Sequence, residues 1–164
     1  LDAGASTGGF TDCLLTAGAA TVHAVDVGYN QLDFSLRRNP RVVVHERTNI
    51  LEVRSLTPAP AIAVCDLSFR SLRGAAAHIL RLTEERRGIA LLKPQFEAAA
   101  EARWGRRDPE SIGDGIVGES LRREVIETTL SDLRTEGIVV VDAFDSPIPG
   151  RSGNREVLVL LSLD

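Results

Sequence analysis

The sequence predicts an α/β fold built on a mostly parallel β-sheet with helices on both faces. Short apolar segments typical of buried strands alternate along its 164 residues with segments that have helical periodicity. Polar or charged residues follow most of the apolar segments, at the positions where an open parallel sheet holds its ligands. The pattern contains no internal repeat and no low-complexity linker, so we expect a single domain.

Each expected strand is a short run of Val, Ile, Leu and Ala bounded by polar or turn-forming residues. The chain opens on the end of a strand at Asp2-Ala3-Gly4. Six further strands are expected at Thr21–Val25, Arg41–His45, Ala61–Cys65, Ile89–Leu92, Ile138–Phe144 and Val157–Leu163. Continuous apolar runs of this length suit strands that are buried on both faces.

Helices are expected where apolar residues recur at helical spacing. The expected helices are Gly9–Ala17, Phe69–Thr83 and Ser120–Thr135, with a shorter helical turn between Tyr29 and Arg38. The stretch from Gln95 to Gly118 shows no clear period, and irregular segments of this length are usually a functional lid or a disordered loop.

The composition is that of a soluble globular protein, with 43% hydrophobic and 26% charged residues. No apolar run approaches the ~20 residues of a membrane span and no signal peptide precedes the first strand, so we expect no membrane partner. Cys13 and Cys65 are expected to be small core residues, and two cysteines without a disulfide framework indicate a reducing, cytoplasmic setting. A net charge of −4 argues against nucleic-acid binding through charge alone, although paired arginines leave room for a few phosphate contacts.

The first ten residues, LDAGASTGGF, combine a strand end, a run of small residues and a helix start. Backbone N–H groups in such a turn can approach a ligand with no side chains in the way. Gly4 and Gly8 are four residues apart and Gly9 follows at once, which is not the dinucleotide spacing G-x-G-x-x-G. Asp26 ends the next strand, where a carboxylate can hold both hydroxyls of a ribose. This variant suits an adenosyl ligand without a pyrophosphate, so S-adenosylmethionine is the first choice of cofactor.

Lys93 is the only lysine among nineteen basic residues. Arginine stays protonated, whereas a partly buried lysine can lose its proton near neutral pH and act as a base. Because Lys93 follows the strand Ile89–Leu92, a catalytic role is favoured over a simple ion pair at a strand end.

Two carboxylates are candidates to accompany this lysine. Asp66 follows the strand Ala61–Cys65, and it either holds the lysine side chain or caps the helix that follows. Glu156 starts the last strand, and it reaches the same crevice only if that strand runs antiparallel to the others. Otherwise Glu156 is a solvent-facing charge at the edge of the sheet.

Seven stretches of the sequence carry a resemblance to a known family, in family order over nearly the whole chain. They are DAGASTGGFT (2–11), AVDVGYNQL (24–32), RVVVHERTNI (41–50), DLSFRSL (66–72), LLKPQFE (91–97), GIV (115–117) and SPIPGRSGNRE (146–156). Together they resemble the TlyA family of hemolysin-A-like ribosomal RNA methyltransferases, whose catalytic domain belongs to the FtsJ/RrmJ-like group. The chain departs from the family pattern at Gly113-Asp114, where Gly-Lys is usual, and at Gly118-Glu119, where Arg-Asp is usual.

The resemblance implies an S-adenosylmethionine-dependent 2′-O-ribose methyltransferase that acts on ribosomal RNA or a ribosomal subunit. It implies a Rossmann-like, mostly parallel seven-stranded sheet with the last strand antiparallel. Family members carry a lysine–aspartate–lysine–glutamate tetrad, and Asp66, Lys93 and Glu156 match its last three positions. The first lysine and an S4-type RNA-binding domain belong upstream of the glycine turn in the family. We therefore expect residues 1–164 to be a methyltransferase domain fragment with little turnover on its own.

In the implied mechanism, Lys93 accepts or polarises the proton of the ribose hydroxyl, Asp66 orients Lys93, and Glu156 positions the partner lysine or the substrate. Gly4 to Phe10 would line the methionine end of the cofactor, and Thr48-Asn49 would border the adenine. The expected cofactor-binding residues are Asp2, Gly4, Ala5, Ser6, Thr7, Gly8, Gly9, Phe10, Asp26, Val27, Thr48, Asn49 and Asp66. No metal ion is expected.

Two other classes of function compete with this interpretation. A nicotinamide-dependent oxidoreductase could use a similar sheet, but the missing pyrophosphate spacing disfavours it. A catalytically inactive cofactor-binding protein or a membrane-active hemolysin is the other alternative, and no amphipathic or spanning segment supports membrane insertion. The pattern predicts no particular oligomeric state.

Overall fold

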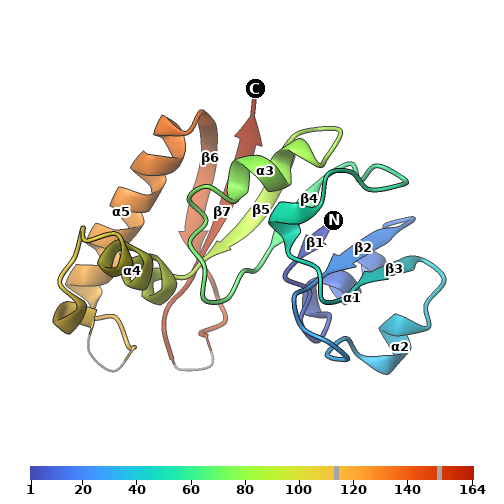
Figure 1. Ribbon diagram of the computed structural model, residues 1–164, viewed down its shortest axis with the longest axis horizontal. Helices are drawn as coiled ribbons and strands as arrows, with labels where there is room; N and C mark the ends of the chain where they lie inside the picture. Colours follow the sequence, from blue (N-terminus) through green and yellow to red (C-terminus); the bar gives the residue numbers. More distant parts are fainter. Residues whose placement is uncertain (113–114, 151–152) are drawn as a thin grey trace.

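The computed structural model of the chain describes residues 1–112, 115–150 and 153–164. Its strands are β1 (Asp2–Ala3), β2 (Val22–Val25), β3 (Val42–His45), β4 (Ala63–Cys65), β5 (Arg87–Leu92), β6 (Ile138–Asp145) and β7 (Val157–Leu163). They form one seven-stranded sheet in the order β3-β2-β1-β4-β5-β7-β6 (Figure 1). The α/β fold with a mostly parallel sheet is confirmed.

The last strand is the one that reverses direction. Strands β1 to β5 pair in parallel, whereas β7 lies between β5 and β6 and is antiparallel to both. Val157, the first residue of β7, pairs with Leu92, the last residue of β5. The residue before β7 and the residue after β5 therefore lie at the same end of the sheet, where the parallel strands terminate. We call this end the C-terminal edge.

The helices are α1 (Gly9–Thr16), α2 (Phe34–Arg37), α3 (Ala76–Arg81), α4 (Pro94–Arg103) and α5 (Glu119–Thr135), with short 3-10 turns η1 (Ile50–Glu52) and η2 (Pro109–Ile112). Figure 1 shows α1 and α2 beside the β1–β3 half of the sheet and α3, α4 and α5 beside the other half. No helix in the described ranges is both long enough and apolar enough to cross a membrane.

Two expectations about the helices are wrong. The helix expected at Phe69–Thr83 is reduced to α3, because residues 66–75 form an irregular loop in which Phe69 has a φ of 60°, outside the helical region. The stretch expected to be irregular from Gln95 onward begins as helix α4. This helix turns Glu97 and Glu101 toward the interior, so the sequence shows no apolar stripe by which to recognise it.

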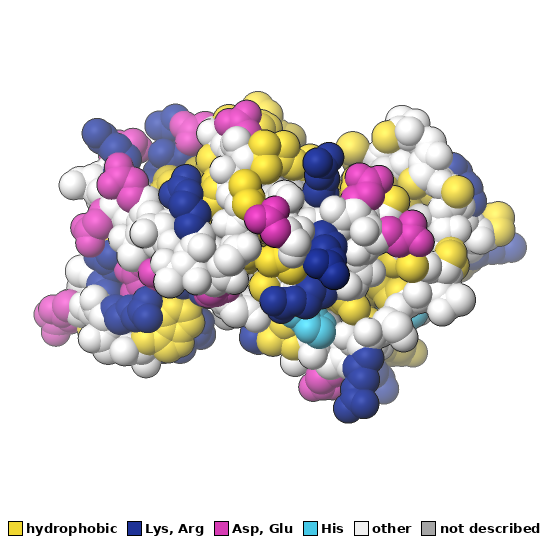
Figure 2. All heavy atoms as spheres, turned by 90° about the horizontal axis from the view of Figure 1, so that it is seen from above, with side chains coloured by type: hydrophobic (Ala, Val, Ile, Leu, Met, Phe, Trp, Pro, Cys, Tyr) yellow, Lys and Arg dark blue, Asp and Glu magenta, His cyan; other side chains and the backbone are white. Residues whose placement is uncertain are grey.

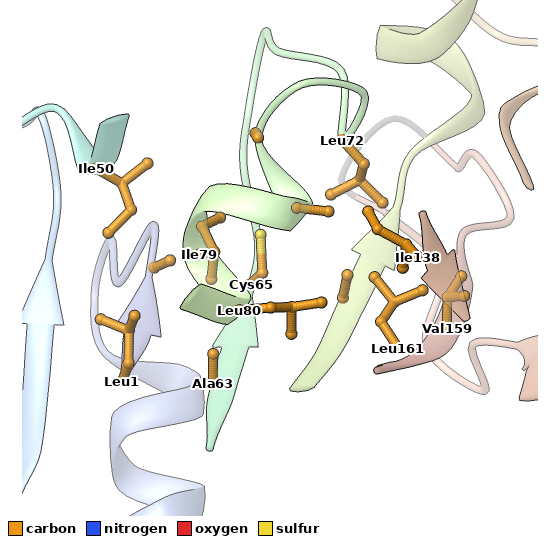
Figure 3. Packing of buried hydrophobic residues seen from close by; sticks show 14 of the residues in the cluster. Leu1, Ile50, Ala63, Cys65, Leu72, Ile79, Leu80, Ile138, Val159 and Leu161 are labelled. Carbon is orange, nitrogen blue, oxygen red and sulfur yellow. The ribbon is translucent and has the colours of Figure 1, made fainter. Parts of the chain in front are cut away.

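The main core lies between the sheet and α3 and α5, and Figure 3 shows Cys65, Leu72, Ile79 and Leu161 packed within it. A second cluster lies under α1 and α2. Cys65 is buried as expected, but Cys13 is exposed on α1, so the core position expected for it is wrong. Acidic and basic side chains are interspersed on the face seen in Figure 2, with no large area of one sign.

Strand β7 offers a matched test of this core. Leu161 points into the core and is 2% exposed, whereas Leu160 lies on the other face and is half-buried. Leu161→Ala should lower the free energy of unfolding by about 2–5 kcal/mol, because it leaves a cavity between β7 and α3. Leu160→Ala should cost less than about half of that. Urea unfolding of both variants checks the assignment of faces, and equal losses would contradict it.

Candidate active site

The residues singled out in the sequence lie at the C-terminal edge of the sheet, where the parallel strands shown in Figure 1 end. Asp26 follows β2, Asp66 follows β4 and Lys93 follows β5. Because β7 is antiparallel, Glu156 enters the sheet at this same edge. A role for Glu156 required an antiparallel last strand, and the structure has one.

The glycine turn, residues 4–9, needs glycine for steric reasons at two positions. Gly4 has a φ of 88°, and a Cβ atom there would lie 2.3 Å from the backbone oxygen of Asp66. Gly8 has a φ of 103° and caps α1, and a Cβ atom there would lie 2.3 Å from a methyl group of Leu36. Between them Ala5 is buried, while the polar Ser6 and Thr7 are exposed. The turn thus presents backbone and small polar side chains to any ligand at this edge.

Asp26 fixes the shape of the turn. Its two carboxylate oxygens accept hydrogen bonds from the backbone N–H groups of Ser6, at 2.8 Å, and Gly28, at 2.6 Å. Each carboxylate oxygen has more than one acceptor site, so these contacts leave capacity for the ribose hydroxyls predicted to bind there.

The residues expected around the adenine lie beside Asp26. Val27, next in the chain, is 71% exposed although it is apolar. The Thr48 N–H donates to the backbone oxygen of Asp26 at 2.9 Å, and the side chain of Asn49 caps η1 by accepting from Leu51 N–H. The structure therefore brings together the residues expected at the nucleoside end. Their contact with a cofactor stays a prediction.

Asp2 lies beneath the turn and is fully buried. The Thr11 hydroxyl donates to its Oδ2 at 2.6 Å. Burial raises the pKa of Asp2 to about 6, and the negative charge of Asp66 adds to the rise. Asp2 therefore supports the first turn of α1 from inside through Thr11, and Phe10, half-buried, is the second residue of the same helix.

Lys93 and Asp66 form an ion pair between Nζ and Oδ1, with side chains that are 12% and 30% exposed. The Lys93 ammonium also donates to Ser68 Oγ at 3.3 Å. Pro94 begins α4 directly after Lys93, so the backbone of the lysine is fixed by the end of β5 and by the start of the helix. Asp66 caps no helix, since α3 begins only at Ala76, and the capping alternative is wrong.

Glu156 is 7% exposed, so the alternative of a solvent-facing edge charge is wrong. Its Oε1 accepts a hydrogen bond from Gln95 Nε2 at 3.1 Å. Within the described ranges Glu156 has no ion pair with Lys93. It contacts Gln95, which lies two residues after Lys93 in the first turn of α4. The sequence reasoning missed Gln95, whose one signal was its place in the stretch LLKPQFE.

The edge carries negative charge close to the glycine turn. Asp2 begins the two-residue strand β1, and Asp26 and Asp66 follow the strands on either side of it. A group of carboxylates attracts cationic ligands over anionic ones. In the part of the chain that is described, no cluster of His, Cys, Asp and Glu side chains could hold a metal ion. The departure at Gly113-Asp114 lies outside the described residues, as does Ser152 of the last matching stretch.

The sequence model of the family described as FtsJ-like methyltransferase matches residues 1–163. The chain belongs to the FtsJ-like methyltransferase family. The seven-stranded sheet described above is therefore the sheet of an FtsJ-like domain.

Individual relatives agree with this family. The chain is 44% identical to the candidate rRNA methyltransferase YqxC of Bacillus subtilis, over 98% of this chain and 56% of that protein. It is 42% identical to the 16S/23S rRNA (cytidine-2′-O)-methyltransferase TlyA of Mycobacterium tuberculosis, over 98% of this chain and 59% of that protein. The resemblance to the TlyA family is confirmed. The chain spans between a half and two thirds of the length of these curated relatives.

A solved structure of a candidate hemolysin from Lactococcus lactis superposes with a TM-score of 0.86. It is 37% identical to this chain, and the match covers 99% of this chain and 76% of that one. The Rossmann-like methyltransferase fold expected from the sequence is confirmed by the strand order together with this match.

The glycine turn allows a matched pair of substitutions. Gly4→Ala should lower the free energy of unfolding by about 2 kcal/mol or more, because the methyl group meets the Asp66 carbonyl and the positive φ is strained. Gly9→Ala should change it by less than about 1 kcal/mol, because Gly9 begins α1 with open space around its Cβ position. Chemical denaturation measures both, and a harmless Gly4→Ala would rule out the close contact with Asp66.

The burial of Asp2 predicts a pH dependence of stability. Its folded-state pKa of about 6 lies above the ordinary 3.8, so its contribution to stability is complete below pH 3.8 and is lost as the pH rises through about 6. Asp2→Asn cannot ionise and keeps an acceptor for Thr11. Between pH 4 and pH 8 the variant should therefore gain up to ~3 kcal/mol of unfolding free energy relative to the unchanged chain. Parallel pH profiles for the two proteins would be inconsistent with a buried, ionising Asp2.

Proposed function

We propose that residues 1–164 form the methyltransferase domain of an S-adenosylmethionine-dependent enzyme that methylates a ribose 2′-hydroxyl of ribosomal RNA. The observation that carries the proposal is the Asp66–Lys93 ion pair beside the glycine turn, where Gly4 packs against the backbone of Asp66. The substrate class is supported by the names of the curated relatives, one of which is an rRNA (cytidine-2′-O)-methyltransferase. The proposal includes a cytoplasmic location and ribosomal RNA or a ribosomal subunit as partner.

The residues at the edge fit S-adenosylmethionine. A sulfonium carries a positive charge and no pyrophosphate, which suits a turn surrounded by carboxylates and lacking the dinucleotide spacing. Residues 4–10 would hold the methionine end, Asp26 the ribose, and Val27, Thr48 and Asn49 the adenine. When bound, the cofactor supplies an electrophilic methyl group.

The protein's part in the reaction is to remove a proton and to align the hydroxyl. A ribose hydroxyl is a weak nucleophile until it loses its proton, so a positioned base is needed. The ammonium of Lys93 in the ion pair first releases a proton to solvent. The resulting neutral amine then takes the proton of the hydroxyl and becomes an ammonium ion again. Asp66 stabilises the ammonium through the observed ion pair and keeps the side chain directed to the edge. The contact between Glu156 and Gln95 fixes the first turn of α4, on which the position of Lys93 depends.

Lys93→Arg tests this role in the protein that carries this chain. Arginine keeps the ion pair with Asp66 but cannot accept a proton. Methylation of ribosomal RNA should fall by about 10²-fold or more, and the affinity for S-adenosylmethionine measured by calorimetry should change little. Arg87→Lys, an exposed exchange at the other end of β5, is the control and should leave both quantities unchanged.

Primer extension at low dNTP concentration, on ribosomal RNA from cells that lack the gene and carry each variant, detects the 2′-O-methyl group as a stop. Normal methylation by the Lys93→Arg protein would refute the assignment of Lys93 as base. Binding of NAD in place of S-adenosylmethionine would instead favour the oxidoreductase alternative.

A further inference from the structure

Helix α4 carries a buried carboxylate that the mechanism above does not use. Glu97 is 1% exposed and lies one helical turn after Lys93. Its Oε2 accepts a hydrogen bond from Ser71 Oγ, and its Oε1 accepts one from the Leu72 N–H at 2.8 Å. We call these two hydrogen bonds the Glu97 anchor. A carboxylate at such a buried position is costly unless it is hydrogen-bonded, so an apolar side chain would be the simpler choice for packing alone.

The Glu97 anchor joins the two segments that hold the ion pair. The loop of residues 66–75 begins at Asp66 and contains Ser71 and Leu72, while α4 follows directly on Lys93. The Asp66–Lys93 pair and the anchor both connect these segments. The Lys93–Ser68 hydrogen bond, the Arg73–Glu101 ion pair and a contact between the rings of Phe69 and Phe96 connect them as well, but the anchor is the buried contact nearest to the pair on α4. The backbone N–H of Glu97 also donates to the backbone oxygen of Lys93 at 3.1 Å. Lys93 and Glu97 are thus held in a fixed relation by the first turn of the helix.

The loop of residues 66–75 needs a connection such as the Glu97 anchor because the residues in its middle are exposed to solvent. Residues 68–70 face solvent, and Phe69 has a positive φ that a regular helix would not allow. Ser71 Oγ also accepts a hydrogen bond from the backbone N–H of Arg73. The hydrogen bonds that begin at Glu97 therefore extend to the residues just before α3. A loop that leaves a strand and is fixed only at a distant helix has freedom at its first residues. Fixing Ser71 and Leu72 shortens the free part of the loop to a few residues after Asp66.

We propose that Glu97 is a positioning residue for methyl transfer, which fixes the loop after β4 to α4 and thereby sets the geometry of the Asp66–Lys93 pair. This inference rests on the proposed function, since it assigns Glu97 a task in the same reaction. Glu97 touches neither substrate nor cofactor in this scheme. A displacement of about 1 Å in a catalytic group can lower a rate by about 10²-fold, so the anchor has a measurable effect on turnover.

The test compares kcat and KM among four variants of the protein that carries this chain. Glu97→Ala removes the anchor, and kcat should fall by about 10–100-fold while KM for S-adenosylmethionine stays within about 3-fold. Glu97→Gln keeps an acceptor for Leu72 N–H and offers its amide to Ser71 Oγ, so kcat should return to within about 3-fold of the unchanged protein. Ser71→Ala removes one of the two hydrogen bonds and should give an intermediate kcat, which covers the case in which Glu97→Ala does not fold.

The fourth variant, Leu161→Ala, separates positioning from stability. It weakens the core beside the start of β5, where Leu161 pairs with Gly88, and it removes no hydrogen bond of the loop. Its kcat per folded molecule should stay near that of the unchanged protein. The proposal is overturned if Glu97→Ala keeps its kcat, if Glu97→Gln is as impaired as Glu97→Ala, or if Leu161→Ala loses as much turnover.

Hydrogen exchange distinguishes a failure of this inference from a failure of the proposed function. Glu97→Ala should accelerate exchange of the Leu72 and Arg73 amides by about 10-fold or more, because these amides donate to Glu97 and Ser71, and it should leave β1 and β2 unchanged. If the unchanged protein methylates no ribosomal RNA, the proposed function fails, and the exchange data still decide whether Glu97 fixes the loop. Unchanged exchange in the loop would overturn the inference whatever the activity.

Discussion

The close packing of the glycine turn against the end of β4 is the constraint on which the rest of the site depends. The chain passes from β1 outward to β2 and β3 on one side, and returns to β4 on the other side of β1. The first turn and Asp66 therefore meet at the point where the strand order reverses, which is where open α/β sheets bind ligands. Gly4 makes the contact possible, because any side chain there would overlap the Asp66 carbonyl. One glycine thus couples the expected cofactor loop to the Asp66–Lys93 ion pair.

The reversal of β7 adds the second half of the site. A parallel last strand would have placed Glu156 at the far edge of the sheet, whereas the observed pairing of Val157 with Leu92 places it beside the start of α4. Gln95 then connects Glu156 to the helix that follows Lys93. Asp66, Lys93 and Glu156 are distant in sequence, yet they lie at the same end of the sheet. The strand order and the antiparallel direction of β7 are sufficient to place them there.

Much of this arrangement could be predicted from the sequence, because apolar strands and the polar residues after them leave a clear pattern. The positions of Asp26, Asp66 and Lys93 at the strand ends are predictable in this way, and that of Glu156 needs only the direction of its strand. Helix α4 is not predictable, because buried glutamates look like surface charges in a sequence. The loop after β4 resembles a helix in the sequence because its apolar residues recur at helical spacing. Hydrogen bonds between distant segments, such as that of Gln95 with Glu156, leave no periodic signal at all.

The hydrogen bonds of Asp26 to Ser6 and Gly28 have a consequence for ligand discrimination. They order the turn before any ligand binds, so little conformational entropy remains to be lost on binding. If adenosine binds there as proposed, such a site recognises the adenosine portion by its shape and distinguishes little between substituents on the sulfur. The demethylated product shares that portion with the cofactor, and it is therefore expected to compete for the same pocket. The rate of methylation would then depend on the ratio of S-adenosylmethionine to its demethylated product in the cell, as well as on the amount of each.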